Sequence, residues 1–440
     1  MKGGSLGLGV HLGELRLEFG LRVGDVGATW GTTGDIAPYT GLATGLSRAG
    51  HQVTVVTSRR YAALFREHGL RVRAMPLDEQ EAAVGAHTTR RARIDNGRDM
   101  ALTAGTVLLE AAGEGTDVLL SHPLLHPQAA VIGQGLGLPC HGVYTVSHAM
   151  MLPRLIAGTP RARYAAADAL VKLALSPLYA PVMTALRREL GLRHRFTGDA
   201  LIPSARRHTV YYGFSSALLP DRMPLPAAHK TVGVWRPAQP PGWRPDARLT
   251  DFLASGPAPV YFGFGSMGED QAERLSRIIT RTVRRLRIRA VVQNGWAGLT
   301  GDGDDILTIG ECPHAWLFPR MAAAVHHAGP GTTHASLRAA LPTLPVPFKL
   351  DQPFWAARLR SLGLTPATVP MRRLGPDGLG LALTRLLADS RYRERTCRIG
   401  ALIEQQDGTA GVIRALGVTG TTSARTGGSR PRPPGRLRRR

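Results

Sequence analysis

Cysteine is scarce in this 440-residue chain. The three that occur, Cys140, Cys312 and Cys397, lie far apart. An odd number of widely spaced thiols supplies neither a disulfide framework nor the paired ligand spacing of a zinc site. This usage is typical of the reducing cytosol. We therefore expect a cytoplasmic protein without a disulfide framework or a metal centre.

Long apolar runs are missing as well. No stretch of about 18 or more apolar residues occurs, so no transmembrane helix is expected. Residues 1–20 are rich in glycine and carry Glu14 and Glu18 among their apolar positions. A secretory signal needs an uninterrupted apolar core, so this segment does not read as one. We expect a disordered N-terminal extension, or residues that reflect where translation was taken to start.

Acidic residues are few. The chain has 32 Asp and Glu against 55 Lys and Arg, which gives a net charge of +23. Residues 419–440 contain seven arginines and no acid, and they offer almost nothing to bury, so we expect a disordered tail. No aromatic residue interleaves these charges, as single-strand nucleic-acid binders require. We expect a solvated tail without a specific partner; the alternative is a contact with an anionic surface, such as a peripheral membrane contact.

Short apolar runs alternate with helical patterns along most of the chain. A hydrophobic content of 43% supports an ordinary packed core. Alternation of this kind predicts an α/β protein with parallel sheets covered by helices on both faces, which bind ligands outside the carboxyl ends of their strands. The expected strands are 52–56, 72–75, 117–120, 140–144 and 209–212 in the first half, and 260–264, 290–293, 306–309, 323–326 and 343–346 in the second.

Proline divides the chain into two parts. The stretch "WRPAQPPGWRPDARL", residues 235–249, is rich in proline and has no periodicity. Because proline removes a backbone donor and fixes φ, this stretch is predicted to link two domains. The expected parts are an extension 1–20, an N-terminal domain 21–235, a linker 236–250, a C-terminal domain 251–418 and a tail 419–440, with the site in the cleft between the domains.

The stretch "VHHAGPGTTHASLRAALPTLPVP" has the pattern of an anion site. A strand ends near His326 and His327, a loop of small residues follows at 328–331, and Thr332 and Thr333 open a helix. A helix start carries free N–H groups and a partial positive charge, which phosphate matches. His327 adds a donor at the same place. The alternative is an ordinary strand–turn–helix with threonine as the N-cap.

Polar residues follow two other strands of the second half. Asp351 and Gln352 offer acceptors and donors suited to sugar hydroxyls. Asp351 is alternatively the cap of the helix that Pro353 begins, and both interpretations can hold together. The strand "VYFGFGSMG" ends at Gly265 and Ser266, which point a hydroxyl group and flexible backbone at the same sheet edge.

The N-terminal half repeats this arrangement in "GTTGDIAPYTGLATGLSRAGHQVTVV". A loop at 31–34 precedes Asp35, which heads a helix. Asp35 either caps that helix or faces the cleft. Two such helix starts, one from each domain, are expected to face each other, so that a carboxylate opposes a phosphate site. The apolar stripe of the helix consists of Ile36, Tyr39, Leu42 and Leu46.

These motifs together resemble a known family. The stretches "GTTGDIAPYTGLATGLSRAGH", "YYGFSSALLP", "VYFGFGSMG", "PHAWLFPR" and "HHAGPGTTHASLRAALPTLPVPFKLDQPFWAARLRSLG" are similar to family-1 glycosyltransferases of the GT-B fold. The bacterial branch related to sterol glucosyltransferases and antibiotic-modifying glycosyltransferases is the most similar. The resemblance spans about residues 21–418. It implies two Rossmann-like doubly wound parallel-sheet domains that face each other across a cleft, the first for the acceptor and the second for the donor.

The resemblance also implies a role for each matching residue. Asp35 falls where relatives carry the catalytic base, and His122, in "LLSHPLLHP", is either an assisting group or a structural histidine. The donor is implied to be a UDP- or dTDP-linked sugar, used as a co-substrate without a further cofactor or metal. The implied donor residues are Ser266, His327, Gly329, Gly331, Thr332 and Thr333 for the diphosphate, Asp351 and Gln352 for the sugar, and Cys312, Pro313 and His314 for the base.

Two features depart from the family pattern. The usual loop reads His-Gly-Gly-Ala-Gly-Thr, and here Ala328 and Pro330 replace a glycine and an alanine. Pro330 must therefore lie where no N–H is needed. The first strand, "LRVGDVGATW", carries Gly24, Asp25 and Gly27 where a buried parallel strand is usually continuous in apolar residues.

The resemblance implies an inverting glycosyltransferase. Residues 144–158, "YTVSHAMMLPRLIAG", are rich in methionine and leucine, which favours an apolar acceptor such as a natural product, a sterol or a lipid. Such residues are alternatively plain core. The alternative function is a non-catalytic nucleotide-sugar-binding protein of the same fold, with the irregular first strand as the cause.

Overall fold

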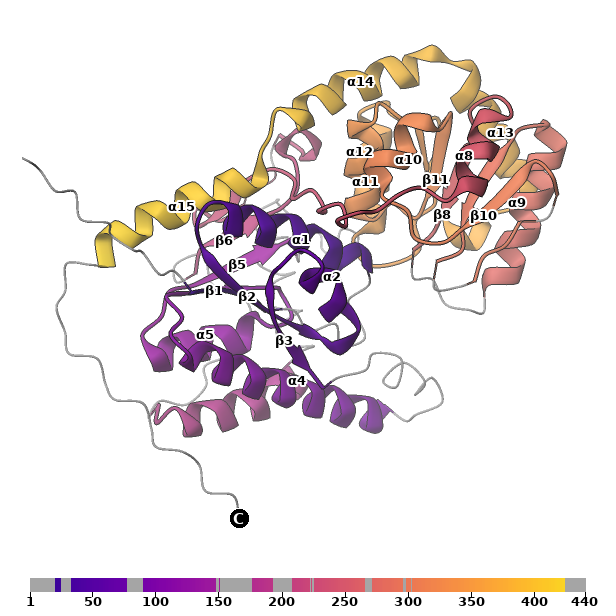
Figure 1. Ribbon diagram of the computed structural model, residues 1–440. Helices are drawn as coiled ribbons and strands as arrows, with labels where there is room; N and C mark the ends of the chain where they lie inside the picture. The colour runs from indigo at the N-terminus through magenta and orange to yellow at the C-terminus, as the bar shows by residue number, and fades with distance from the viewer. Residues whose placement is uncertain are drawn as a thin grey trace, which may run out of the picture.

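The structure is a computed structural model, and its elements form two sheet-centred halves (Figure 1). It describes residues 20–24, 33–76, 90–147, 150, 176–192, 208–221, 223, 225–265, 271–295, 298–301 and 303–423.

The first sheet contains seven parallel strands in the order β3-β2-β1-β4-β5-β6-β7. β1 is an interior strand and pairs with both β2 and β4, despite the glycine at each end. Asp25 and Gly27, which made this strand look irregular, lie outside the described residues. The strands are β1 (Gly20–Gly24), β2 (Gln52–Ser58), β3 (Arg71–Met75), β4 (Val118–Ser121), β5 (Cys140–Tyr144), β6 (Val210–Tyr212) and β7 (His229–Thr231).

Helices cover both faces of this sheet. On one face the helix α1 (Thr33–Arg48) buries its predicted stripe of Ile36, Tyr39, Leu42 and Leu46 completely. The C-terminal helix α15 (Gly408–Ser423) returns across the molecule and packs against α1. It thus joins the N-terminal sheet and extends past residue 418, where the tail was expected to begin. The remaining helices are η1 (Arg59–Tyr61), α2 (Ala62–Arg66), α4 (Arg90–Gly113), α5 (His126–Leu136) and the helical residues 176–189.

The second sheet has five parallel strands in the order β10-β9-β8-β11-β12. Helices α9 and α13 cover one face and α8 and α10 the other. The strands are β8 (Val260–Gly263), β9 (Ala290–Gln293), β10 (Ile306–Ile309), β11 (Ala323–His326) and β12 (Thr343–Pro345). The helices are α8 (Ala247–Ala254), α9 (Ala272–Leu286), α10 (His314–Leu317), η5 (Phe318–Arg320), α11 (Pro330–Arg338), α12 (Gln352–Ser361), η6 (Met371–Arg373), α13 (Pro376–Ala388) and α14 (Ser390–Glu404).

All ten strands expected from apolar runs are confirmed, with bounds that agree within two residues. Most are short and largely buried, as strands covered on both faces must be, whereas the edge strands β3 and β10 are more exposed. The structure contains two further strands that were not among these ten. They are β1, which the sequence left in doubt, and the short edge strand β7. The predicted α/β architecture with two parallel sheets is confirmed.

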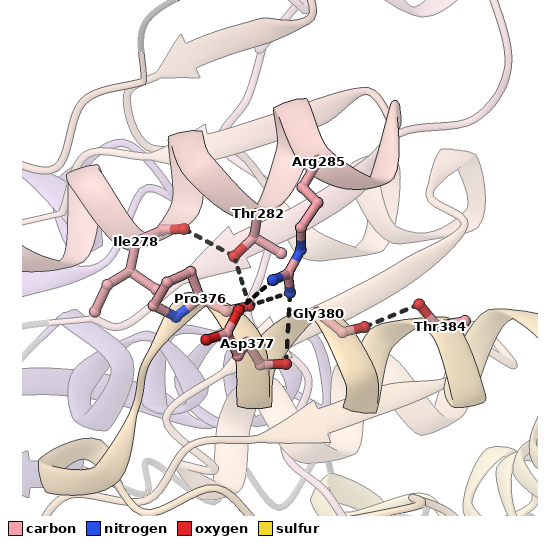
Figure 2. Close-up of polar contacts among 7 residues, drawn as sticks. All are labelled: Ile278, Thr282, Arg285, Pro376, Asp377, Gly380 and Thr384. Atoms are coloured by element: carbon pink, nitrogen blue, oxygen red, sulfur yellow. Dashed lines mark hydrogen bonds and ion pairs between the residues drawn. The ribbon is translucent and has the colours of Figure 1, made fainter.

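Polar contacts fasten α9 to α13 on the outer face of the second sheet (Figure 2). The Arg285 guanidinium donates to Pro376 O at 2.7 Å and pairs with the Asp377 carboxylate. A Cβ at Gly380 would lie 2.1 Å from Arg285 Nη2, so a larger residue there would have to displace the guanidinium from this position. These contacts hold α9 and α13 together over one face of the second sheet.

The two halves share one apolar cluster beside the linker. Phe214 and Leu218, which follow β6 of the first sheet, pack against α12 through Trp355 and Leu359. Fully buried aromatic and large aliphatic side chains in this cluster come from both halves of the sequence, so the halves meet through packed core and not through solvent. The site described next lies close to this junction.

Candidate active site

The starts of two helices from different sheets meet. α1 follows β1 of the first sheet, and α11 follows β11 of the second. A Cβ placed on Gly331 would lie 3.6 Å from Gly34 O, and the two helices are in contact. The expectation that the two glycine-rich helix starts face each other is thus confirmed. Asp35 stands in the first turn of α1, and its carboxylate lies outside the described part of the structure.

His326 is a structural residue. Its Nδ1 accepts from the Ala328 N–H at 3.0 Å, and its Nε2–H donates to Thr343 Oγ1 on the neighbouring strand. Complete burial lowers the pKa of His326 well below its usual value, so the ring is neutral. The bond to Ala328 supports a left-handed backbone there, with φ of +65°, which is uncommon for alanine. His326 therefore fixes the first residue of the loop.

His327 fills a slot between two glycines. A Cβ on Gly329 would lie 2.5 Å from His327 Nε2, and a Cβ on Gly265 would lie 3.1 Å from Cε1. Burial lowers the pKa of His327 to about 4, although a hydrogen bond with the Gly263 backbone acts to raise this pKa. The ring is therefore neutral near pH 7, and one of its nitrogens carries a proton that it can donate. The side chain stays partly exposed, beside the start of α11.

The residue that caps the start of α11 is not the threonine that the sequence offered as an alternative. Gly329 is the N-cap and Pro330 is the first helical residue, so the alternative that a threonine caps this helix is wrong. Pro330 lies at the position where its missing N–H is not needed, as the sequence required. The hydroxyl group of Thr333 is completely buried and has no hydrogen-bond partner among the described residues. The helix start thus combines free backbone donors with an unused buried hydroxyl group.

Asp351 and Gln352 organise the turn between β12 and α12. Asp351 is the N-cap residue of α12, but its side chain makes no cap bond, because Oδ2 accepts from Trp355 Nε1 at 2.8 Å. Gln352 Oε1 accepts from the N–H groups of Phe348 and Lys349 at 2.8 and 3.1 Å. Asp351 is thus a cap by position but not by hydrogen bonding. Both residues lie at the carboxyl edge of the sheet from which α11 begins.

The segment from Cys312 to His314 lies beside the same edge. His314 stacks on Phe318 with ring centroids 4.2 Å apart, and its Nε2 lies 3.4 Å from Tyr261 Oη. Burial and the nearby His327 lower the pKa of His314 to about 4. Burial raises the pKa of the Cys312 thiol to about 11. His314 and His327 therefore belong to one cluster of neutral rings around the ends of β8 and β11.

His122 lies on the side of the first sheet that carries α1. Its Nδ1 accepts from the Leu124 N–H at 3.3 Å, and its ring meets Tyr39 edge-on at 5.7 Å. Tyr39 stands one helical turn beyond Asp35 and donates to Val143 O at 2.7 Å. The backbone bond agrees with a structural histidine. An assisting role beside Asp35 stays a prediction.

Several expected site residues cannot be placed. Ser266 lies outside the described residues, and so does most of the expected acceptor segment 144–158. Within that segment, Tyr144 and Met150 are buried in the cluster shared by the two halves, so these two are core residues. Within the described residues, no group of three His, Cys, Asp or Glu comes together in a way that suits a metal ion. None of the helices described there is both long and apolar enough to span a membrane.

Two further residues, neither of which belongs to a predicted motif role, hold the site together. His334 donates to Pro330 O, and Trp355 donates to Asp351 Oδ2. In both pairs the partners are four residues apart, which is the spacing of neighbours on one helix face. A search for polar residues one turn beyond each helix start would have found both.

Comparison with known proteins agrees with this geometry. Residues 290–414 match the family model "Erythromycin biosynthesis protein CIII-like, C-terminal domain". The glycotransferase of kitacinnamycin superposes with a TM-score of 0.68 at 19% identity, over 92% of this chain and 99% of that one. The glycosyltransferase VinC, solved in complex with dTDP, gives 0.65 at 19% identity, over 91% and 99%. Two facing parallel sheets with this helix start therefore define a GT-B fold.

Two curated relatives extend the match to the sequence. O-mycaminosyltylonolide 6-deoxyallosyltransferase of Streptomyces fradiae is 30% identical over 414 residues, which are 86% of this chain and 93% of that protein. Sterol 3-beta-glucosyltransferase UGT80A2 of Arabidopsis thaliana is 27% identical over 88% of this chain and 64% of its own length. This chain thus spans less than two thirds of the plant protein. It belongs to the GT-B glycosyltransferases, in the branch that includes sterol and antibiotic glycosyltransferases.

Proposed function

We propose that this protein transfers a sugar from a nucleotide diphosphate sugar to a hydroxyl group of an apolar small molecule, with inversion at the anomeric carbon. The observation that carries the proposal is the contact between the starts of α1 and α11. It supports a site in which Asp35, in the first turn of α1, acts beside an anion bound at the start of α11. A carboxylate opposite an anion site is the arrangement that a displacement at a sugar carbon requires.

The start of α11 supports the donor side of the proposal. Its backbone N–H groups and positive end suit a diphosphate, and the slot around His327 puts a neutral N–H donor beside them. As the bond to the sugar breaks, negative charge grows on the diphosphate, and these donors stabilise it. Gly329 and Gly331 leave the backbone open to close approach, and the buried Thr333 hydroxyl group offers a further donor.

Asp35 supplies the base in this mechanism. Its carboxylate takes the proton of the acceptor hydroxyl group, whose oxygen attacks the anomeric carbon on the face opposite the leaving nucleotide. General base catalysis of this kind contributes about 10²–10⁴-fold. His122, next to Tyr39 on the same side, is the candidate for a supporting role.

The remaining donor residues complete the proposed site. Asp351 and Gln352 stand at the sheet edge beside α11 and bind the sugar hydroxyl groups, whereas the segment Cys312–His314 contacts the base. Ser266 contributes a hydroxyl group at the end of β8. VinC was solved with dTDP, which supports a dTDP- or UDP-linked donor here. Relatives named for sterol and macrolide-type acceptors support an apolar acceptor, and the three free cysteines agree with work in the cytoplasm.

The experiment first measures which nucleotide sugar the protein binds and then whether it transfers that sugar to an acceptor. The purified full-length chain is mixed with a panel of UDP- and dTDP-sugars, and native mass spectrometry shows which donor is retained. The retained donor is then incubated with sterols and polyketide aglycones, and products are detected by mass. We expect one donor class to be retained and at least one glycoside to form. Retention without transfer or hydrolysis would favour the alternative, a nucleotide-sugar-binding protein without catalysis.

A further inference from the structure

His334 occupies an unusual position in α11. It is buried, with 2% of its surface exposed, and it lies one turn beyond the start of the helix. Its Nδ1 is 2.6 Å from Pro330 O, and its Nε2 is 3.1 Å from the backbone nitrogen of Ser215. Because a carbonyl only accepts and an N–H only donates, the ring must be neutral with its proton on Nδ1. Both ring nitrogens therefore have defined partners.

The partner Ser215 comes from the other half of the chain, 119 residues earlier. It follows β6 of the first sheet, and its hydroxyl group caps η3 (Ser216–Leu218) by accepting from the Ala217 N–H at 3.1 Å. The backbone at Ser215 is thus held firmly by its own segment. The bond from this N–H to His334 ties that segment to the helix proposed to bind the diphosphate.

A second route leads from the same ring to the proposed sugar site. His334 packs edge-on against Trp355 with centroids 5.4 Å apart, and Phe214 packs on the same indole at 5.6 Å. Trp355 Nε1 donates to Asp351 Oδ2 at 2.8 Å. Asp351 is therefore oriented by an indole that is itself held between His334 and the segment after β6.

We propose that His334 is a positioning residue that sets the geometry of the donor site from the junction between the two sheets. One bond fixes the carbonyl of Pro330 and so the first turn of α11, and the ring also seats Trp355 and with it Asp351. The inference rests on the proposed function for the identity of the ligand. Its physical basis is that a site held within fractions of an ångström depends on the groups behind it. A shift of about 1 Å can reduce catalysis by about 10²-fold.

Three variants separate the two bonds of the ring. His334→Asn keeps an N–H donor near the Nδ1 position and so retains the bond to Pro330 O. His334→Gln places an amide oxygen near the Nε2 position and so retains the bond from Ser215. His334→Ala removes both bonds. The matched control is His141→Ala, which removes another buried histidine near the amino end of β5, away from the carboxyl edge of its sheet.

The first measurement is hydrogen exchange of the Ser215 amide in the ligand-free protein. Slow exchange is expected in the wild type and His334→Gln, and faster exchange in His334→Ala and His334→Asn. The second measurement is the affinity for UDP and dTDP by calorimetry, with the KM for donor and acceptor. We expect His334→Ala to weaken nucleotide binding and raise the donor KM about tenfold with the acceptor KM unchanged. His334→Asn and His334→Gln should each recover part of the lost affinity. The control His141→Ala should leave the donor KM unchanged.

The outcomes distinguish this inference from the proposed function. A wild-type protein that binds neither nucleotide overturns the proposed function and the inference with it. A wild-type protein that binds one of them, with unchanged affinity and donor KM in His334→Ala, overturns the inference alone. If His334→Ala does not fold, the Asn and Gln variants decide: wild-type affinity and donor KM in both would equally contradict the positioning role.

Discussion

The two helix starts that meet in this molecule are built differently. At the start of α11, His326 fixes the Ala328 N–H, His334 fixes the Pro330 carbonyl, and the slot around His327 excludes any side chain from Gly329. At α1 the described anchors begin one turn later, where Tyr39 bonds to Val143 O and the Thr40 hydroxyl group accepts from the Ala238 N–H. The donor side is thus preorganised by the chain around it. The acceptor side is fastened behind the residue proposed to perform the chemistry.

This difference predicts that chemistry and donor binding can be separated. Asp35→Asn should reduce transfer by about 10²–10⁴-fold, because the amide cannot accept the acceptor's proton. Nucleotide affinity should stay near the wild-type value, because α11 keeps all its contacts. Transfer is measured by product mass and affinity by calorimetry. Asp99→Asn, which makes the same charge change on α4, is the control. Near-normal turnover in Asp35→Asn would remove this residue from the mechanism.

His327→Ala tests the other helix start. Loss of a neutral donor beside the proposed diphosphate should weaken nucleotide binding about tenfold or more, since hydrogen bonds to charged groups contribute about 1.5–3 kcal/mol. Transfer should fall as well, because the leaving group loses a donor. Calorimetry with UDP and dTDP measures the first effect. Unchanged affinity for both nucleotides would contradict the role of His327 and leave that of Asp35 standing.

Substitution of the neighbouring His326 should affect the stability of the fold, whereas substitution of His327 should affect nucleotide binding. His326→Ala removes two buried hydrogen bonds and leaves a cavity, so the free energy of unfolding should fall by about 2–4 kcal/mol. Chemical denaturation measures this loss. The variant His327→Ala is the matched comparison, and it should be much closer to the wild type in stability. Equal destabilisation by the two substitutions would show that the pair is not divided into a structural and a functional histidine.

Acid should loosen the start of α11 more than that of α1. Burial lowers the pKa of His327 and His334 to about 4, whereas histidine in the unfolded chain titrates near 6.5. Unfolding therefore takes up protons below pH 6.5, and the stabilisation present above that pH is lost as the pH falls toward 4. The buried His334 contributes on the order of 1 kcal/mol or more to this pH-dependent loss of stability, and the partly exposed His327 acts in the same direction. The helix α1 contains no histidine.

Hydrogen exchange at pH 7 and pH 5 measures this effect locally. After correction for the intrinsic rates, amides of β11 and α11 should exchange faster at pH 5, with a smaller change in α1. His141 and His229, whose pKa values are also lowered to about 4, act on the first sheet in the same direction, so some change is expected there. Equal acceleration in α1 and α11 would contradict a local origin.

The fold could be read from the sequence because it rests on local patterns. Each strand is a short apolar run, and the apolar stripe of α1 follows the helical period, so neither depends on distant contacts. The position of the donor loop could likewise be predicted from a local pattern, the small residues between a strand and a helix. The resemblance implies a ligand-binding role for His327 and none for His326, and the two buried hydrogen bonds of His326 agree with a structural role for that residue.

What the sequence did not supply are the contacts between distant segments. Ser215 and His334 are joined only because β6 and α11 come together at the junction of the two sheets. The bond between Trp355 and Asp351 is a different case, because the two residues are four apart on one helix face and their spacing is visible in the sequence. Residues that support a site through contacts between distant segments carry no motif of their own, so only the folded chain reveals them.

The smallest predicted effect concerns Pro330, the residue that departs most from the family loop. Pro330 is the first residue of α11, where an N–H would have no intrahelical partner. The backbone carbonyl of residue 330 accepts from His334, and it is present in both the wild type and Pro330→Ala. Pro330→Ala should therefore leave nucleotide affinity unchanged. It should lower the free energy of unfolding by only about 0.4–1 kcal/mol, because alanine gives the unfolded chain more freedom. Denaturation and calorimetry on the same preparation measure both quantities. A loss of affinity as large as that of His327→Ala would mean that the rigid φ of proline, and not the bonds around the loop, preorganises the donor side.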